Sequence, residues 1–81
     1  MANLELYTAS LGRVLRSQRK EKGFSQEELA HRVGLDRTYI SLLERGLRQP
    51  TLGTLVKLSE ALEIQPEDFV AELGRPYTPD Q

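Results

Sequence analysis

The stretch QEELAHRVGLDRTYISLLER, residues 26–45, places two short helical patterns on either side of one glycine. Apolar residues recur at helical spacing before and after Gly34, and the small residue Ala30 precedes that glycine by four positions. A large side chain at position 30 would push two crossing helices apart, and Gly34 can adopt the left-handed conformation that a tight turn requires. The stretch therefore predicts a helix-turn-helix motif.

Two signals mark the start of the first of these helices. Ser25 and Glu28 form the S-x-x-E pattern of a capping box, in which the serine hydroxyl accepts a backbone N–H of the first turn. Phe24 and Leu29 stand at the two positions of a hydrophobic staple. Both signals predict a helix over residues 26–33.

The second helix of the pair is expected to begin after Asp36 and to end near Arg45. Asp36 is predicted to cap this helix by accepting backbone N–H bonds with its carboxylate, a contribution of ~1 kcal/mol. Gly46 follows the last helical residue, as is usual for the left-handed residue that closes a helix. Capping therefore explains an acidic residue at the head of this helix.

Three more helices complete the pattern. A basic amphipathic helix is predicted over residues 10–22, a fourth helix after the cap residue Thr51, and a fifth from Pro66 to about residue 73. Gly53 in the first turn of the fourth helix costs up to ~1 kcal/mol relative to alanine. The fourth helix is expected to turn these apolar residues inward: Leu52, Leu55, Val56, Leu58 and Leu62.

The predicted fold class is all-α, a compact domain of five helices, because no run of alternating β-branched residues suggests a strand. We expect residues 1–9 to be an N-terminal extension and residues 10–74 to form the domain. Residues 75–81 contain two prolines and little to bury, so they are expected to be a flexible tail.

The net charge of −1 is unevenly divided along the chain. Residues 11–50 hold nine basic and five acidic residues, a net charge of +4, and the rest of the chain carries −5. Binding to a phosphate backbone depends on the local patch more than on the total charge. A basic helix face can equally be an ordinary solvated face, so charge alone does not establish DNA binding.

Several function classes lack the residues that they need. The 81-residue chain has no cysteine and one histidine, His31, which is expected on the surface. Without a Gly-rich phosphate loop or acidic residues near that histidine, no catalytic, metal or cofactor site is predicted, and no small-molecule ligand is expected. No apolar run approaches the ~18 residues that span a bilayer, and no signal-peptide pattern opens the sequence. We therefore expect a soluble cytoplasmic protein.

Three stretches resemble the Cro/C1-type helix-turn-helix proteins, also called the XRE family. They are RKEKGFSQEELA (residues 19–30), GLDRTYISLLERG (34–46) and RQPTLGTLVKLSEALEIQPEDF (48–69). The resemblance covers about residues 11–73 and implies a lambda-repressor-like domain whose third helix enters the major groove of double-stranded DNA. It implies a transcriptional regulator. The LDRTYIS stretch looks like the controller proteins of restriction–modification systems, and phage-type repressors and antitoxins share much of it.

The resemblance also implies which residues contact DNA. Gln26 is similar to a glutamine that contacts the DNA backbone or an adjacent base from the start of the second helix. The base-reading positions of the third helix are occupied by Arg37, Thr38, Ser41 and Leu42. Phosphate contacts are expected from Tyr39, Arg45, Arg48, Arg16 and Arg19.

Some of these assignments have an alternative. Tyr39 could be a half-buried ring, and Arg45 could cap its own helix or form an ion pair. Leu42 could pack against a neighbouring helix. The competing function for the whole chain is a protein-interaction module, such as an antitoxin, in which DNA binding is secondary.

The last helix carries an apolar edge made of Phe69, Val70 and Leu73. In the family that this chain resembles, single-domain members commonly pair through this region, so we predict a symmetric homodimer. Its recognition helices would lie ~34 Å apart and bind a near-palindromic operator. Phe69 is also the staple partner of Ile64, so a place in the core is the alternative for this ring.

Overall fold

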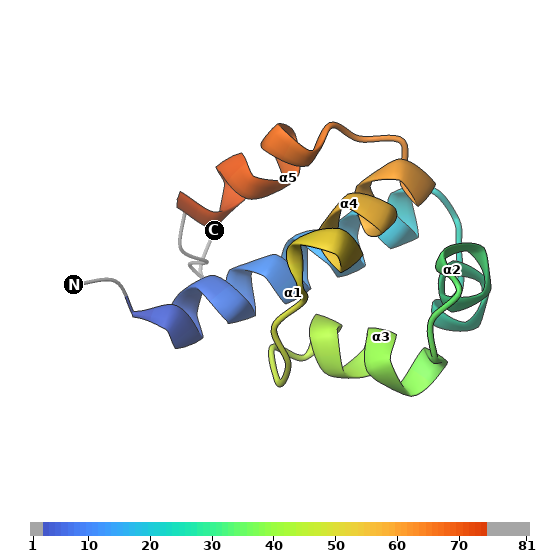
Figure 1. Cartoon of the computed structure of the whole chain (residues 1–81), viewed down its shortest axis with the longest axis horizontal. Helices are drawn as coiled ribbons and strands as arrows, with labels where there is room; N and C mark the ends of the chain where they lie inside the picture. The colour runs from blue at the N-terminus through green and yellow to red at the C-terminus, as the bar shows by residue number, and fades with distance from the viewer. Residues whose placement is uncertain (1–2, 75–81) are drawn as a thin grey trace.

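The computed structural model describes residues 3–74 of the chain, and it is helical with no strand over that range. Its elements are α1 (Leu4–Glu21), α2 (Gln26–Val33), α3 (Arg37–Glu44), α4 (Leu52–Ala61), α5 (Pro66–Ala71) and a short 3-10 helix, η1 (Glu72–Gly74). The longest helix, α1, lies between α5 and α3, and α2 closes the end at which α1 finishes (Figure 1). The predicted all-α fold with five α-helices is confirmed.

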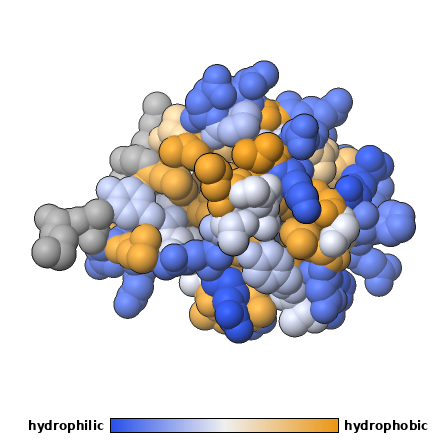
Figure 2. Space-filling model, viewed as in Figure 1, coloured by the Kyte–Doolittle hydropathy of each residue, from blue (hydrophilic) through white to orange (hydrophobic). Residues whose placement is uncertain are grey.

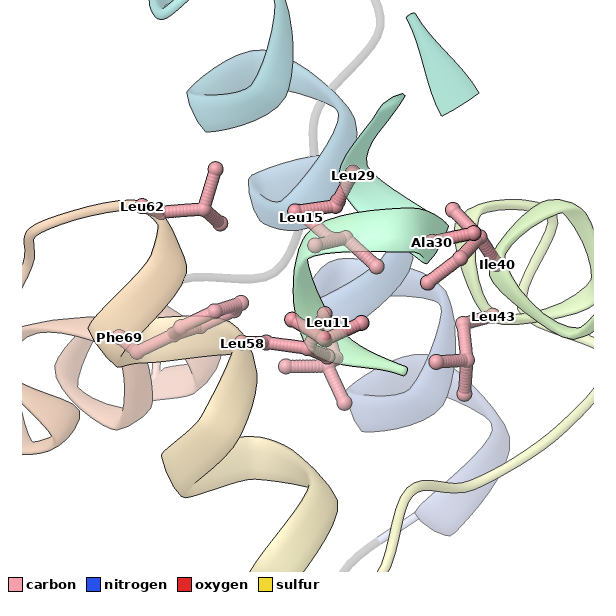
Figure 3. Packing of buried hydrophobic residues seen from close by; sticks show 10 residues of the cluster. Leu11, Leu15, Leu29, Ala30, Ile40, Leu43, Leu58, Leu62 and Phe69 are labelled. Atoms are coloured by element: carbon pink, nitrogen blue, oxygen red, sulfur yellow. The ribbon is translucent and has the colours of Figure 1, made fainter. Parts of the chain in front are cut away.

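Apolar side chains from all five α-helices meet in one core (Figure 3). Two leucines of α1 lie at its centre, and the helix-turn-helix contributes residues from both of its helices. The buried residues labelled in Figure 3 are Leu11, Leu15, Leu29, Ala30, Ile40, Leu43, Leu58, Leu62 and Phe69. Because α2 and α3 are anchored in this core, the outward face of α3 is held in a fixed orientation.

The first helix begins at Leu4, six residues earlier than predicted. Asn3 caps it, since its Oδ1 accepts hydrogen bonds from the backbone nitrogens of Glu5 at 3.0 Å and Leu6 at 3.4 Å. Residues 4–9, which were expected in an extension, are therefore part of α1. Their helical pattern is hidden in the sequence because Leu4 and Leu6 are exposed and do not point to the core.

Gly12 is a position that the sequence analysis did not single out. It is buried where α1 crosses the end of α3, and a β-carbon placed there would lie 2.4 Å from the carbonyl oxygen of Leu43 and 2.6 Å from that of Glu44. Gly46 is a second close approach, because its β-carbon would lie 3.1 Å from the Cα of Ala9. The backbones of α1 and α3 therefore pack together with no side chain between them.

The predicted start of α2 is confirmed, but only half of the capping box is formed. The hydroxyl of Ser25 accepts a hydrogen bond from the backbone nitrogen of Glu28 at 3.0 Å. The carboxylate of Glu28 instead accepts a hydrogen bond from Arg32 at 3.1 Å, one turn along the helix. Gly34 has φ +70° and ends α2 in the left-handed conformation, as predicted.

The predicted side-chain cap at Asp36 is wrong. Asp36 has the backbone conformation of an N-cap residue, but its carboxylate accepts no hydrogen bond from the first turn of α3. The entry to α3 is fixed in another way: the backbone nitrogen of Leu35 donates to the carbonyl of Ala30 at 2.9 Å, and Ile40 is fully buried. The turn and the core therefore hold this helix start without the aspartate side chain.

The prediction for the inner face of α4 is wrong for two of its five residues. Leu58 and Leu62 are buried and Leu55 packs against the core, whereas Leu52 is 77% exposed and Val56 is 37% exposed. Residues 52 and 56 are one turn apart and lie beside the buried face of α4 rather than on it. The α4 helix therefore has a wide apolar face with one edge exposed.

The C-terminal part of the predicted domain follows the expected course. Thr51 caps α4 by accepting a hydrogen bond from the backbone nitrogen of Thr54 at 3.1 Å, and Pro66 is the first residue of α5. The predicted tail, residues 75–81, lies outside the described residues. No helix among residues 3–74 is long and apolar enough to cross a membrane.

Candidate nucleic-acid interface

The α3 helix has one exposed face and one buried face. Arg37 and Thr38, in its first turn, are exposed, and Ser41 is partly exposed one turn later. On the opposite side Ile40 and Leu43 are buried in the core. The structure therefore gathers three of the four predicted base-reading residues on one outward surface, while the buried side fixes the helix in place.

Tyr39 and Leu42 lie at the margins of this surface. The ring of Tyr39 is partly buried and packs against the core, which agrees with the alternative that its ring is half-buried. Leu42 is also partly buried. Both residues border the exposed face of α3, and their contacts with DNA remain predictions.

Arg19 does not lie where it was predicted to act. Its guanidinium group forms a two-pronged ion pair with the carboxylate of Glu44, with Nε 2.6 Å from Oε2 and Nη2 3.0 Å from Oε1. Its Nη1 donates to the carbonyl oxygen of Phe24 at 2.8 Å. The side chain is buried, so Arg19 ties α1 to α3 and its predicted phosphate contact is replaced by a structural role.

Gln26, the first residue of α2, takes part in the same network. Its Nε2 donates to Oε1 of Glu44 at 3.0 Å, and the side chain is partly exposed. Glu44 was not predicted from the sequence, because its partners Gln26 and Arg19 are 18 and 25 residues away and no local spacing links them. Among residues 3–74 no buried side-chain nitrogen or oxygen lacks a hydrogen-bond partner.

Three predicted phosphate-contacting arginines remain at the surface. Arg16 on α1 and Arg45 and Arg48 after α3 are all exposed. Within the described residues none of the three has a hydrogen bond or an ion pair. The alternative in which Arg45 caps its own helix therefore has no support from a hydrogen bond in this part of the chain.

The predicted dimer edge on α5 is only partly available to another molecule. Phe69 is 1% exposed and lies in the core, so the core alternative is the correct one for this ring. Leu73 packs against the core and is half-buried, whereas Val70 is 45% exposed. In the view of Figure 2 apolar side chains gather over α4 and the adjoining part of α5. Val70 and the outward residues of α4, Leu52 and Val56, are the exposed large apolar residues of these two helices.

No group of three or more His, Cys, Asp or Glu side chains among the described residues could hold a metal ion. His31 is exposed, as predicted.

Comparisons with known proteins converge on one family. A helix-turn-helix family model matches residues 15–69, which make up most of the chain. Control protein C.BamHI from Bacillus amyloliquefaciens is 45% identical over 60 residues, which cover 73% of this chain and 74% of that protein.

Two solved structures have the same fold. The restriction-modification controller protein C.AhdI from Aeromonas hydrophila matches with a TM-score of 0.74 and 44% identity, covering 76% of this chain and 94% of that one. SinR, the master regulator for biofilm formation, was solved in complex with DNA and matches with a TM-score of 0.71 and 34% identity. That match covers 74% of this chain and 97% of that one.

Proposed function

The chain belongs to the XRE-type helix-turn-helix family, and on this premise we propose that it is a sequence-specific transcriptional regulator that binds double-stranded DNA through α3. The single observation that carries the proposal is the outward face of α3. Arg37 and Thr38 are exposed at its N-terminal end, while the other side of the helix is locked into the core. Arginine pairs with the O6 and N7 atoms of guanine, and threonine can donate, accept or meet a thymine methyl group.

The distribution of charge supports the same surface. Residues 11–50, which contain all of α2 and α3 and most of α1, carry the net charge of +4, whereas the rest of the chain is acidic. Arg45 and Arg48 are exposed beyond the end of α3, next to the helix that would enter the groove. Such cations contact phosphates and set the orientation of a protein on the duplex.

We propose further that the regulator acts as a homodimer on a near-palindromic operator. A single short recognition helix makes few contacts, and two of them one helical turn apart, ~34 Å, would combine their affinities. The exposed Val70 on α5 and the exposed face of α4 supply apolar surface for pairing. C.AhdI is named as a restriction-modification controller protein and C.BamHI as a control protein, so a controller role in the cytoplasm is the proposed biological setting.

Selection of bound duplexes from a random pool tests the proposal. The wild-type protein is expected to enrich a near-palindromic sequence, and Arg37→Ala is expected to lose the preference at one base position in each half-site. Lys57→Ala is the matched control, because Lys57 is an exposed cation on α4 and not on α3. A pool that shows no enrichment, with binding that falls steeply with salt for all three proteins, would leave only nonspecific phosphate attraction.

A further inference from the structure

One buried carboxylate connects all three helices of the proposed DNA-binding half. Glu44 is the last residue of α3, and its side chain is 3% exposed. It accepts two hydrogen bonds from Arg19 of α1 and one from the amide of Gln26 at the start of α2.

A contribution to the stability of the fold does not explain well why Glu44 is buried. A negative charge at the C-terminal end of a helix opposes the helix dipole, so Glu44 is unfavourably placed within α3. A buried ion pair is also frequently no more stabilising than a well-packed apolar pair of the same size. We therefore look for a role of this carboxylate other than stabilising α3.

The chemistry of the carboxylate restricts the amide of Gln26. An ionised carboxylate only accepts hydrogen bonds, so the amide nitrogen must face Glu44 and the amide oxygen must face away from it. The amide cannot turn over without placing two acceptors against each other. Gln26 is partly exposed, so its remaining N–H and its oxygen stay available on the surface in one defined orientation.

We propose that Glu44 is a positioning residue of the DNA-binding surface, which holds the Gln26 amide in one orientation and at one place relative to Arg37 and Thr38. The proposal rests on the proposed function. Because Glu44 belongs to α3 itself, the amide on α2 moves with the recognition helix as one unit. An amide that is already oriented loses less freedom when it meets DNA, and this raises affinity without adding a contact.

The test uses the intact chain and the duplex selected with the wild-type protein. Arg19→Met combined with Glu44→Leu replaces the ion pair by apolar side chains of similar size, so that no buried charge is left unpaired. This double variant is expected to keep its thermal midpoint and to bind the duplex roughly tenfold more weakly, as does Gln26→Ala. The triple variant is expected to bind no more than about twofold more weakly than the double variant, since both changes remove the same positioned amide.

Lys22→Gln combined with Glu63→Gln is the matched control. It removes an exposed ion pair between the ends of α1 and α4 and leaves the net charge unchanged, as does the Arg19 and Glu44 variant. It is expected to bind within about twofold of the wild-type protein. A merely structural role of Glu44 would change the thermal midpoint without coupling to position 26.

Each outcome decides between the hypotheses. Wild-type affinity in the double variant, or a triple variant weakened about a hundredfold by two independent losses, would overturn the role of Glu44 and leave the proposed function intact. A double variant that does not fold is replaced by Glu44→Gln, whose amide offers a donor as well as an acceptor and so no longer fixes one orientation of the Gln26 amide. The same coupling to Gln26→Ala is then required. A wild-type protein that selects no duplex would instead overturn the proposed function.

Discussion

Gly12 lies where the backbones of α1 and α3 touch, and it is the residue at which the smallest change should cost the most stability. A methyl group there would meet the carbonyl oxygens of Leu43 and Glu44 at 2.4 and 2.6 Å, and backbone atoms cannot turn aside as a side chain can. We expect Gly12→Ala to lower the free energy of unfolding by ~1–3 kcal/mol, the usual range for overpacking. Urea titration followed by circular dichroism measures this loss.

Gly53→Ala is the matched control, because the same methyl group is added to another helix. Gly53 is exposed in the first turn of α4, and the nearest atom to its added β-carbon is 3.9 Å away. Alanine restricts the unfolded chain and favours the helix, so this variant should gain up to ~1 kcal/mol. Equal effects at the two glycines would contradict the close crossing of α1 and α3.

Arg37 and Arg48 are both exposed arginines, but they are expected to act differently on DNA. Arg37→Ala removes a group that can read a base edge, so it should cost ~1–3 kcal/mol on the selected duplex and abolish the preference at one position. Arg48→Ala should weaken binding to all sequences alike and reduce the slope of log affinity against log salt by about 1. Affinities measured at several salt concentrations, on specific and scrambled duplexes, distinguish the two roles.

The helix starts differ in how far a side chain secures them. Ser25 caps α2 with a hydrogen bond to the backbone nitrogen of Glu28, whereas Asp36 makes no such bond at the start of α3. We therefore expect Ser25→Ala to lower the free energy of unfolding by ~1 kcal/mol. Asp36→Ala should fall within the ±0.5 kcal/mol that is usual for a surface change. An equal loss for both variants in chemical denaturation would show that Asp36 does cap its helix.

The ends of α1 and α4 are joined by an ion pair that depends on pH. The Nζ of Lys22 lies 2.7 Å from Oε1 of Glu63, and the hydrogen bond and charge of Lys22 lower the pKa of that carboxyl group below its ordinary value. The folded protein therefore holds the proton less tightly than the unfolded chain does. The resulting stability is complete above the ordinary carboxyl pKa, and it is lost as the pH falls through the lowered pKa of the folded state.

This linkage is checked with Glu63→Gln in thermal unfolding at several pH values. The wild-type protein should be the more stable of the two near neutral pH, and the difference should close in acid. In a Lys22→Met background the pH dependence of the Glu63→Gln change should be weaker, because Lys22 is the main group that lowers the pKa of Glu63. A difference that persists unchanged into acid would mean that the ion pair does not form in solution.

Local sequence signals predicted the bounds of the helix-turn-helix closely, and they predicted the start of α1 and the contacts between helices less well. The bounds of α2 follow from Ser25 and Gly34, which act within one turn of themselves, so a single sequence contains what is needed. The start of α1 does not follow from local residues, because Leu4 and Leu6 are exposed and give no pattern of inward-facing residues. The Arg19–Glu44 pair depends on the tertiary crossing of α1 and α3, and for this reason a basic residue was predicted to contact DNA and is instead buried.

Charge is divided between two parts of the chain, and this division supports the proposed DNA-binding surface. The basic residues lie mostly on α1 to α3, and the acidic residues outside that half include Glu60 and Glu63 on and after α4 and Glu67 and Asp68 on α5. If the chain binds DNA as proposed, this division favours approach of the duplex to α1, α2 and α3 over approach to α4 and α5. The resemblance implies that Arg37, Thr38 and Ser41 read bases, and the structure leaves these residues wholly or partly exposed, whereas the contact between Gln26 and Glu44 required the structure.

Pairing of two chains is the last property that can be predicted from the whole surface. Burial of Phe69 in the core leaves Val70 as the exposed member of the predicted edge, while Leu52 offers a second apolar site on α4. If α5 forms the interface, Val70→Glu should raise the dissociation constant of the dimer at least tenfold, since it buries an unpaired charge. It should also weaken binding to the palindrome while leaving half-site affinity unchanged. Sedimentation equilibrium measures the dissociation constant of the dimer for Val70→Glu and for the paired variant Leu52→Glu. Loss of the dimer in Leu52→Glu but not in Val70→Glu would show that the interface lies on α4. Binding of two monomeric wild-type subunits to each operator would contradict the proposed dimer.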